Sequence, residues 1–153
     1  MDQIDRKILA ELQSDARLTL TELADRIGLS LSPCHRRVHA LEKSGAIQGY
    51  RACIDYRKLG LTFSAIVFVT LSESNKQLVQ IFEDALLTIP EVISAERLFG
   101  TPDYILHIIT KDLSSFQKLY DEQLSSLSCV KKLTSTIVMK DIFQGKKASY
   151  PVF

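Results

Sequence analysis

The sequence lacks the features that mark several large classes of protein. It has only three cysteines, at Cys34, Cys53 and Cys129, and their isolated positions predict neither a disulfide framework nor paired zinc ligands. Its six glycines form no glycine-rich phosphate loop and no nucleophile elbow of a hydrolase. We therefore expect a reduced, cytoplasmic protein that is not an enzyme and that binds no cofactor.

Long hydrophobic runs are also absent. The longest lies near residues 65–71, far short of the roughly twenty residues that a membrane span requires. The N-terminal residues are acidic, whereas a signal peptide begins with basic residues. No membrane partner is expected.

The chain has no large excess of charge of one sign, because its net charge is +1. This value argues neither for nor against binding to nucleic acid. The distribution is uneven. Residues 1–25 hold three Lys/Arg and six Asp/Glu, a net charge of −3, whereas residues 26–60 hold seven and two, a net charge of +5. A basic segment of this kind attracts phosphates, although charge runs also occur on ordinary solvated surfaces.

Two short helices are predicted near the N-terminus. Residues 2–14 carry Ile4, Ile8, Leu9 and Leu12 on one side, the spacing of an amphipathic helix. Thr19 and Glu22 have the spacing of a capping box that opens a second helix, and Gly28 ends it.

A third helix follows after only a few residues. Ser32 is predicted as its N-cap and Pro33 as its first residue, while Gly45 lies just past its end. Cys34, Val38 and Leu41 form its buried stripe. This spacing predicts a helix-turn-helix whose second helix enters the major groove of DNA. The candidate DNA-binding residues are Ser30, Ser32, Pro33, His35, Arg36, Arg37 and His39, with Arg37 predicted either to contact phosphate or to brace the domain.

The segment after this helix alternates apolar and polar residues. Residues 46–50 and 51–55 therefore predict two short strands. Together with the three helices they predict a winged helix-turn-helix domain over residues 1–50, followed by a linker strand over residues 51–60.

Metal binding is an alternative function for part of the same helix. His35 and His39 are one turn apart beside Cys34, an arrangement that could begin a metal site. No second Cys/His pair completes a tetrahedron, and Cys34 belongs to the apolar stripe. DNA contact is the favoured function of the two histidines, and no metal site is predicted.

The rest of the sequence predicts a second domain over residues 61–143 and a tail over residues 144–153. Strands are expected at 65–71, 91–99, 103–110 and 130–143, and amphipathic helices at 75–89 and 113–127. The order βαββαβ is that of a ferredoxin-like α/β sandwich, so the whole chain is predicted to be an α+β protein. The first strand is apolar on both faces, which favours self-association through the sheet face that no helix covers.

These residues resemble a known family. The segments 4–9, 23–24, 28–30, 37–42 and 45–47 are similar to the DNA-binding domain of the Lrp/AsnC, or feast/famine, transcriptional regulators. Residues 55–60 resemble the linker of that family, and residues 100–104 resemble its effector loop. The resemblance implies homodimers that pair through their sheets and assemble into octamers, and a double-stranded, pseudo-palindromic DNA operator.

The resemblance further implies an amino-acid effector bound between neighbouring dimers. The residues matched to that site are Leu98, Gly100, Thr101, Pro102, Asp103, Tyr104, Thr134, Ser135 and Thr136. The loop at residues 100–103 is equally a good tight turn on local grounds, since Gly, Pro and Asp all favour turns. One alternative function is a small-molecule-binding regulatory subunit that acts through protein contacts rather than DNA. A second alternative is a ferredoxin-like enzyme, which would require a polar pocket that the sequence does not indicate.

Overall fold

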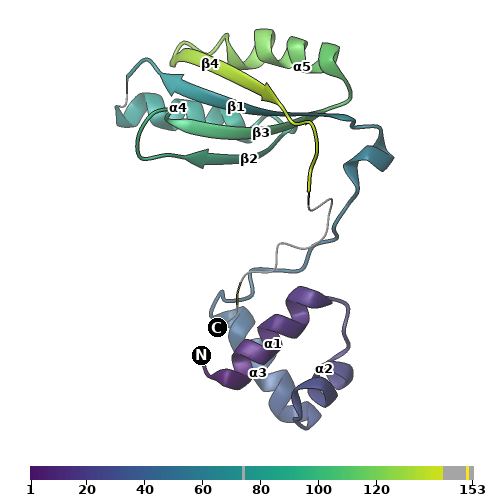
Figure 1. Cartoon of the computed structure of the whole chain (residues 1–153). Helices are drawn as coiled ribbons and strands as arrows, with labels where there is room; N and C mark the ends of the chain where they lie inside the picture. The colour runs from purple at the N-terminus through teal and green to yellow at the C-terminus, as the bar shows by residue number, and fades with distance from the viewer. Residues whose placement is uncertain (74, 143–150, 152–153) are drawn as a thin grey trace. The chain divides into compact units, whose positions relative to one another are not determined.

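The computed structural model of the chain describes residues 1–73, 75–142 and 151, and it divides into two compact units (Figure 1). The first unit comprises Met1–Ile54 together with the tail residue Pro151, and the second comprises Asp55–Ile142. Each unit has its own cluster of buried apolar side chains. Among the described residues, no helix has both the length and the hydrophobicity needed to cross a membrane.

Three helices form the first unit, as the sequence predicts. They are α1 (Gln3–Ser14), α2 (Leu20–Ile27) and α3 (Leu31–Lys43). The predicted capping box of α2 is present: Thr19 accepts from the backbone of Glu22, and the Glu22 carboxylate accepts from the backbone of Thr19. All three helices contribute to the core, which contains Ile8, Leu23, Ala24, Cys34, Val38 and Leu41.

The start of α3 differs from the prediction. Its N-cap is Ser30, not Ser32, and Pro33 is the third helical residue rather than the first. Proline costs no hydrogen bond anywhere in the first turn, because the backbone N–H groups there have no partner within the helix. Pro33 therefore does not define the first residue of the helix.

The two strands predicted at 46–50 and 51–55 are wrong. Residues 46–55 form no strand, and the predicted linker strand over 51–60 contains instead a 3-10 turn, η1 (Tyr56–Leu59). An alternating pattern forms a strand only where a partner strand supplies the ladder of hydrogen bonds, and among the residues that the structure describes no strand pairs with this segment.

The second unit is a four-stranded antiparallel sheet in the order β2-β3-β1-β4. Its elements in chain order are β1 (Phe63–Leu71), α4 (Lys76–Leu87), β2 (Val92–Arg97), β3 (Tyr104–Thr110), α5 (Leu113–Leu119), the π-helical turn η2 (Tyr120–Leu124) and β4 (Val130–Ile137). Both helices lie on the same side of the sheet (Figure 1). The predicted ferredoxin-like α/β sandwich is confirmed.

Most element ends in this unit lie within two residues of the predicted ones, and two differ by more. The helix expected over 113–127 changes to π geometry after Leu119. The last strand ends at Ile137 rather than at residue 143, and residue 143 itself lies outside the described residues.

The two faces of β1 differ in what covers them. Ala65, Val67 and Val69 are fully buried in the core shared with α4 and α5. The alternate residues Ile66 and Phe68 are only half-buried. The second face therefore keeps apolar surface, as expected for a sheet that pairs with another molecule.

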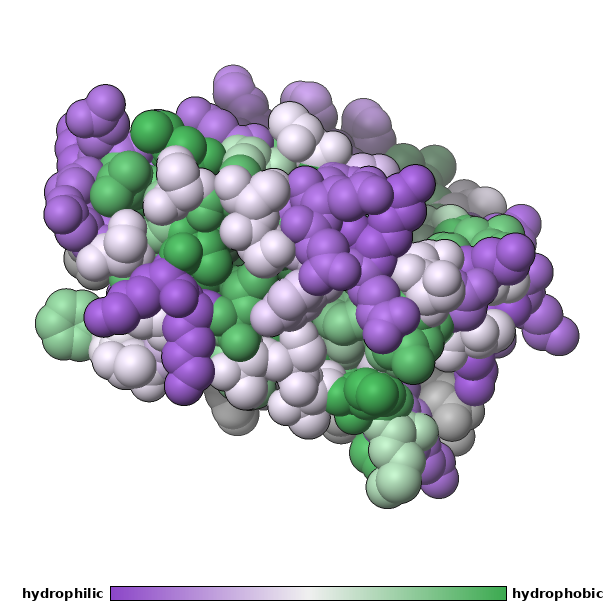
Figure 2. All heavy atoms as spheres, turned by 90° about the horizontal axis from the view of Figure 1, so that it is seen from above, coloured by the Kyte–Doolittle hydropathy of each residue, from purple (hydrophilic) through white to green (hydrophobic). Residues whose placement is uncertain are grey.

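The outer edge of the sheet at β4 is more hydrophilic. Lys131 and Lys132 are exposed there, and charged side chains on an edge strand discourage unwanted strand pairing. Figure 2 views the chain from above, from the side on which β4 and α5 lie in Figure 1, and hydrophilic residues there separate the hydrophobic ones into patches.

Candidate DNA-binding surface and effector loop

The turn between α2 and α3 is short and well defined. Gly28 has φ of 74°, and its N–H donates to the carbonyls of Ala24 and Asp25. The N–H of Leu29 also donates to Ala24, at 2.9 Å. A positive φ favours glycine, so Gly28 fixes the direction in which α3 begins and gives the helix-turn-helix arrangement.

Most of the predicted DNA-binding residues lie on the side of α3 away from the core. Cys34, Val38 and Leu41 are buried on one side. Of the candidates, Ser30, Ser32, His35, Arg36 and His39 are exposed, and Pro33 and Arg37 are half-buried. One surface thus combines a guanidinium group, two imidazoles and two hydroxyls, which are the groups that hydrogen-bond phosphates and base edges.

The N-terminus of α3 differs from those of α1 and α2. Asp2 and Thr19 cap α1 and α2 through their side chains, and each of those helices has an acidic residue in its first turn. In α3 the N-cap Ser30 makes no side-chain hydrogen bond to the helix, and the first turn has no acidic residue. The helix dipole at this end therefore keeps its attraction for an anion such as a phosphate.

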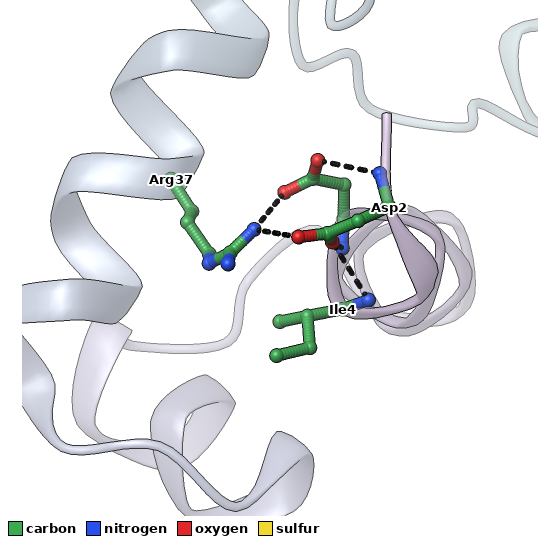
Figure 3. A network of polar contacts seen from close by, with 4 residues as sticks. Asp2, Ile4 and Arg37 are labelled. Atoms are coloured by element: carbon green, nitrogen blue, oxygen red, sulfur yellow. Dashed lines mark hydrogen bonds and ion pairs between the residues drawn. The ribbon is translucent and has the colours of Figure 1, made fainter.

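Arg37 is tied to α1 rather than directed away from the protein (Figure 3). Its Nη1 donates to Asp2 Oδ2 at 2.7 Å and to Asp5 Oδ1 at 2.8 Å. Asp2 also accepts from the backbone N–H groups of Ile4 and Asp5, each at 2.9 Å. Of the two predicted roles for Arg37, the contacts support bracing. No local pattern indicates Asp2 and Asp5 as partners of Arg37, because they lie more than thirty residues away in the chain.

This network predicts a loss of stability in acid. Hydrogen bonds from the backbone of Asp5 and from Arg37 hold the pKa of Asp2 below its ordinary value. A carboxyl whose pKa is lower in the folded state stabilises the fold above its unfolded pKa of about 3.9, and this contribution disappears as the pH falls through the folded pKa. Urea unfolding of Asp2→Asn and wild type, followed by circular dichroism, is expected to show a larger stability difference at pH 6 than at pH 3. An equal difference at both pH values would rule out this linkage.

The end of α3 is held by a second polar contact. Tyr50 donates from its hydroxyl to Glu42 at 3.0 Å, and His39 Nδ1 lies 3.9 Å from the same carboxylate. Burial and the neighbouring Glu42 raise the pKa of Tyr50. These contacts fix the chain as it leaves α3 while the His39 ring stays exposed.

The alternative metal site gains no support from the geometry. Cys34 is fully buried, whereas His35 and His39 are exposed on the same helix. Burial raises the pKa of the Cys34 thiol, which disfavours the thiolate that a metal requires. Within the described part of the chain, no three His, Cys, Asp or Glu side chains are grouped as metal ligands.

The candidate effector loop joins β2 to β3. Gly100 has φ of 145° and the Thr101–Pro102 peptide bond is cis. Asp103 anchors the loop to β1: its N–H donates to the carbonyl of Val69 at 2.8 Å, and its Oδ2 accepts from the N–H of Leu71 at 2.7 Å. One oxygen of the Asp103 carboxylate, the group predicted to face the ammonium of a ligand, therefore accepts a hydrogen bond from the backbone of β1.

The residues of the candidate effector loop differ in exposure and fall into three groups. Gly100 and Thr101 are exposed and Leu98, Pro102 and Asp103 are half-buried, whereas Tyr104 is buried in the core. The Tyr104 hydroxyl donates to Glu83 of α4 at 2.8 Å, and burial together with Glu83 raises its pKa to about 12. Tyr104 therefore acts as a support under the loop, and its side chain is not available to a ligand.

The second part of the candidate effector site lies on a different strand. Thr134, Ser135 and Thr136 are exposed on β4, and they pair with Phe68, Val67 and Ile66 of β1. The loop is anchored on the other side of β1, next to β3. Adjacent strands are about 4.8 Å apart, so within one chain the two parts are separated by the width of β1.

The helix-turn-helix, the basic exposed face of α3 and the separate α/β sandwich together indicate a DNA-binding protein with a second, separate domain. Residues 1–48 match a family of winged helix-turn-helix DNA-binding domains, and residues 64–148 match the Lrp/AsnC ligand-binding domain. The chain belongs to the Lrp/AsnC family of DNA-binding transcriptional regulators.

Individual relatives cover nearly the whole chain. The proline dehydrogenase transcriptional activator of Rhodobacter capsulatus is 35% identical over 149 residues, which are 97% of each chain. The leucine-responsive regulatory protein of Escherichia coli K12 is 35% identical over 147 residues, covering 96% of this chain and 90% of the relative. A transcriptional regulator of Neisseria meningitidis, solved in complex with L-Met, superimposes with a TM-score of 0.92 at 33% identity and covers 99% of this chain and 96% of its own.

Proposed function

We propose that the chain binds a specific DNA operator through α3 and that an amino acid bound by its second domain modulates this binding. The observation that carries the proposal is the exposed face of α3, where Arg36, His35 and His39 lie beside a helix N-terminus that no side chain caps. Arg36 and the histidines reach base edges or phosphates, and Ser30 and Ser32 contact the backbone near the helix N-terminus.

The operator in this proposal is a pseudo-palindrome read by a dimer. The half-buried apolar residues Ile66, Phe68 and Ile105 on the open sheet face support pairing of two sheets, and two such dimers or more then form the larger assembly that the family resemblance implies. A two-fold dimer presents two copies of α3 to half-sites about one helical turn apart, or a multiple of one turn.

The effector in this proposal is an amino acid held between neighbouring dimers. The exposed backbone of Gly100 and Thr101 offers groups to a zwitterion, and Asp103 supplies negative charge for its ammonium. The separation of the loop from Thr134 by β1 supports a site completed by a second chain. The complex of the Neisseria meningitidis regulator with L-Met supports an amino acid as the ligand class.

A thermal-shift screen of the amino acids tests the effector site. We expect one amino acid to raise the melting temperature of the wild-type chain, because a ligand at 100 times its Kd stabilises a protein by about 2.7 kcal/mol. Asp103→Asn should abolish this increment, since it keeps an oxygen that can accept from Leu71 but removes the charge. Asp121→Asn, at an exposed carboxylate of η2, is the matched control and should keep the increment. An increment unchanged in Asp103→Asn would reject the site, and no stabilisation by any amino acid would reject the effector.

The rival function is a regulatory subunit that binds a small molecule and acts through protein contacts. It predicts an effector response like the one above but no specific complex with DNA. The basic exposed face of α3 and the absence of an acidic residue in its first turn disfavour this rival function. If the rival were correct, a DNA titration of the full chain would show only weak, sequence-independent binding.

A further inference from the structure

The first unit contains a groove on the α1 side, apart from the exposed face of α3. One wall comes from α1, with Leu9 and Leu12, and the other from the segment that follows α3, with Ile47 and Tyr50. Its volume is about 780 Å³. The lining is mainly apolar, and none of the residues assigned to DNA contact takes part in it. Neither DNA binding nor effector binding accounts for this groove.

One described residue of the tail lies at this groove. Pro151, which is the one tail residue that the structure describes, lines it together with α1 and residues 46–51. Pro151 belongs to the same compact unit as Met1–Ile54, although β4 of the other unit precedes it in the chain. Thirteen residues lie between Ile137 and Pro151, and at up to about 3.3–3.6 Å per residue this length suffices to cross a small domain.

We propose that residues 150–153 dock in this groove and so attach the end of the effector domain to the DNA-binding domain of the same chain. The sequence of this segment, Tyr-Pro-Val-Phe, suits an apolar groove, because burying the Val and Phe side chains away from water lowers the free energy. The preceding residues include Lys146 and Lys147, which suit a solvated spacer.

Docking has a direct consequence for regulation. The groove wall formed by residues 46–51 continues directly from α3, and the tail continues from β4, which carries Thr134 and Thr136. The tail is thus a second connection between the candidate effector site and the DNA-binding helix, in addition to the linker at Asp55–Gly60. A change at β4 can alter the tail only if docking differs between the liganded and free states.

The absence of tryptophan from the chain allows a direct test. In the full-length Phe153→Trp variant the single tryptophan reports the environment of the tail. We expect emission at shorter wavelength than in the urea-unfolded chain, and protection from acrylamide. Ala16→Glu places a charge at the groove and should shift the emission to longer wavelength. Ala10→Glu is the matched control, because Ala10 is exposed on α1 outside the groove, and it should leave the emission unchanged.

Three results would overturn the proposal. They are solvent-like emission of Phe153→Trp in the folded chain, a shifted emission that Ala16→Glu does not affect, and an emission that moves to the solvent value on dilution, which would assign the groove to the tail of a second copy.

A second measurement avoids the new side chain: removal of residues 148–153 should speed amide hydrogen exchange at residues 46–51. Ala148→Asp, which lies before the docking segment, should leave that exchange unchanged.

Discussion

Replacing Arg36 with alanine is expected to weaken operator binding about tenfold to 100-fold without lowering the melting temperature. The guanidinium is exposed on α3, and one base contact contributes about 1–3 kcal/mol to discrimination. If Arg36 contacts a phosphate instead, affinity should fall alike for all sequences, and the slope of log K against log salt should fall by about 1. Fluorescence anisotropy with operator and scrambled DNA measures both quantities.

Arg37→Ala is the matched comparison, because Arg37 is the neighbouring guanidinium but binds Asp2 and Asp5 of α1. We expect this variant to lower the melting temperature of the DNA-binding unit. Its DNA affinity should fall because α3 is no longer held in position against α1. The slope of log K against log salt should stay close to that of wild type. A normal melting temperature for Arg37→Ala, combined with a reduced salt slope, would show that Arg37 contacts DNA and that the bracing role is wrong.

The largest stability effect is expected at the centre of the second unit. Phe82 is fully buried between α4 and the sheet, with its ring centroid 4.8 Å from that of Tyr104. Phe82→Ala should lower the free energy of unfolding of this unit by about 3–5 kcal/mol, because it removes buried apolar surface and leaves a cavity. A typical domain has only about 5–15 kcal/mol of stability, so a large part of it would be lost.

The neighbouring residue on α4 provides the control for this prediction. Ile81 is 46% exposed, so Ile81→Ala should change the free energy of unfolding by about 0.5 kcal/mol or less. Urea titrations followed by circular dichroism measure both variants. A Phe82→Ala effect below about 1 kcal/mol, or equal effects at the two positions, would show that the core is not organised around Phe82.

Local patterns in the sequence were sufficient to predict most elements of the fold. The capping box at Thr19 and Glu22 and the glycine at position 28 define the ends of α2, because both signals act within a few residues. The start of α3 was placed two residues late, since Ser30 and Ser32 are equally suitable N-caps and Pro33 is tolerated throughout the first turn. The strands at 46–55 were predicted wrongly because alternation does not reveal whether a partner strand exists.

The contacts that hold the candidate sites in place could not be predicted in the same way. Asp103 accepts from Leu71, and Tyr104 donates to Glu83, residues that are distant in sequence and come together only through β-sheet pairing and the packing of α4. The exposed side of α3 was predicted correctly from its spacing. The position of Arg37 between Asp2 and Asp5 depends on how α1 packs against α3, which no local pattern contains.

A DNA titration of the full-length wild-type chain at two salt concentrations tests most directly whether α3 is a specific DNA-binding surface. The probe is the DNA upstream of the gene for this chain, and a scrambled sequence of the same length is the control. We expect a complex that scrambled DNA does not displace, with an affinity that falls steeply with salt because phosphate contacts release counterions. Equal affinity for the two sequences, or an affinity independent of salt, would contradict the account.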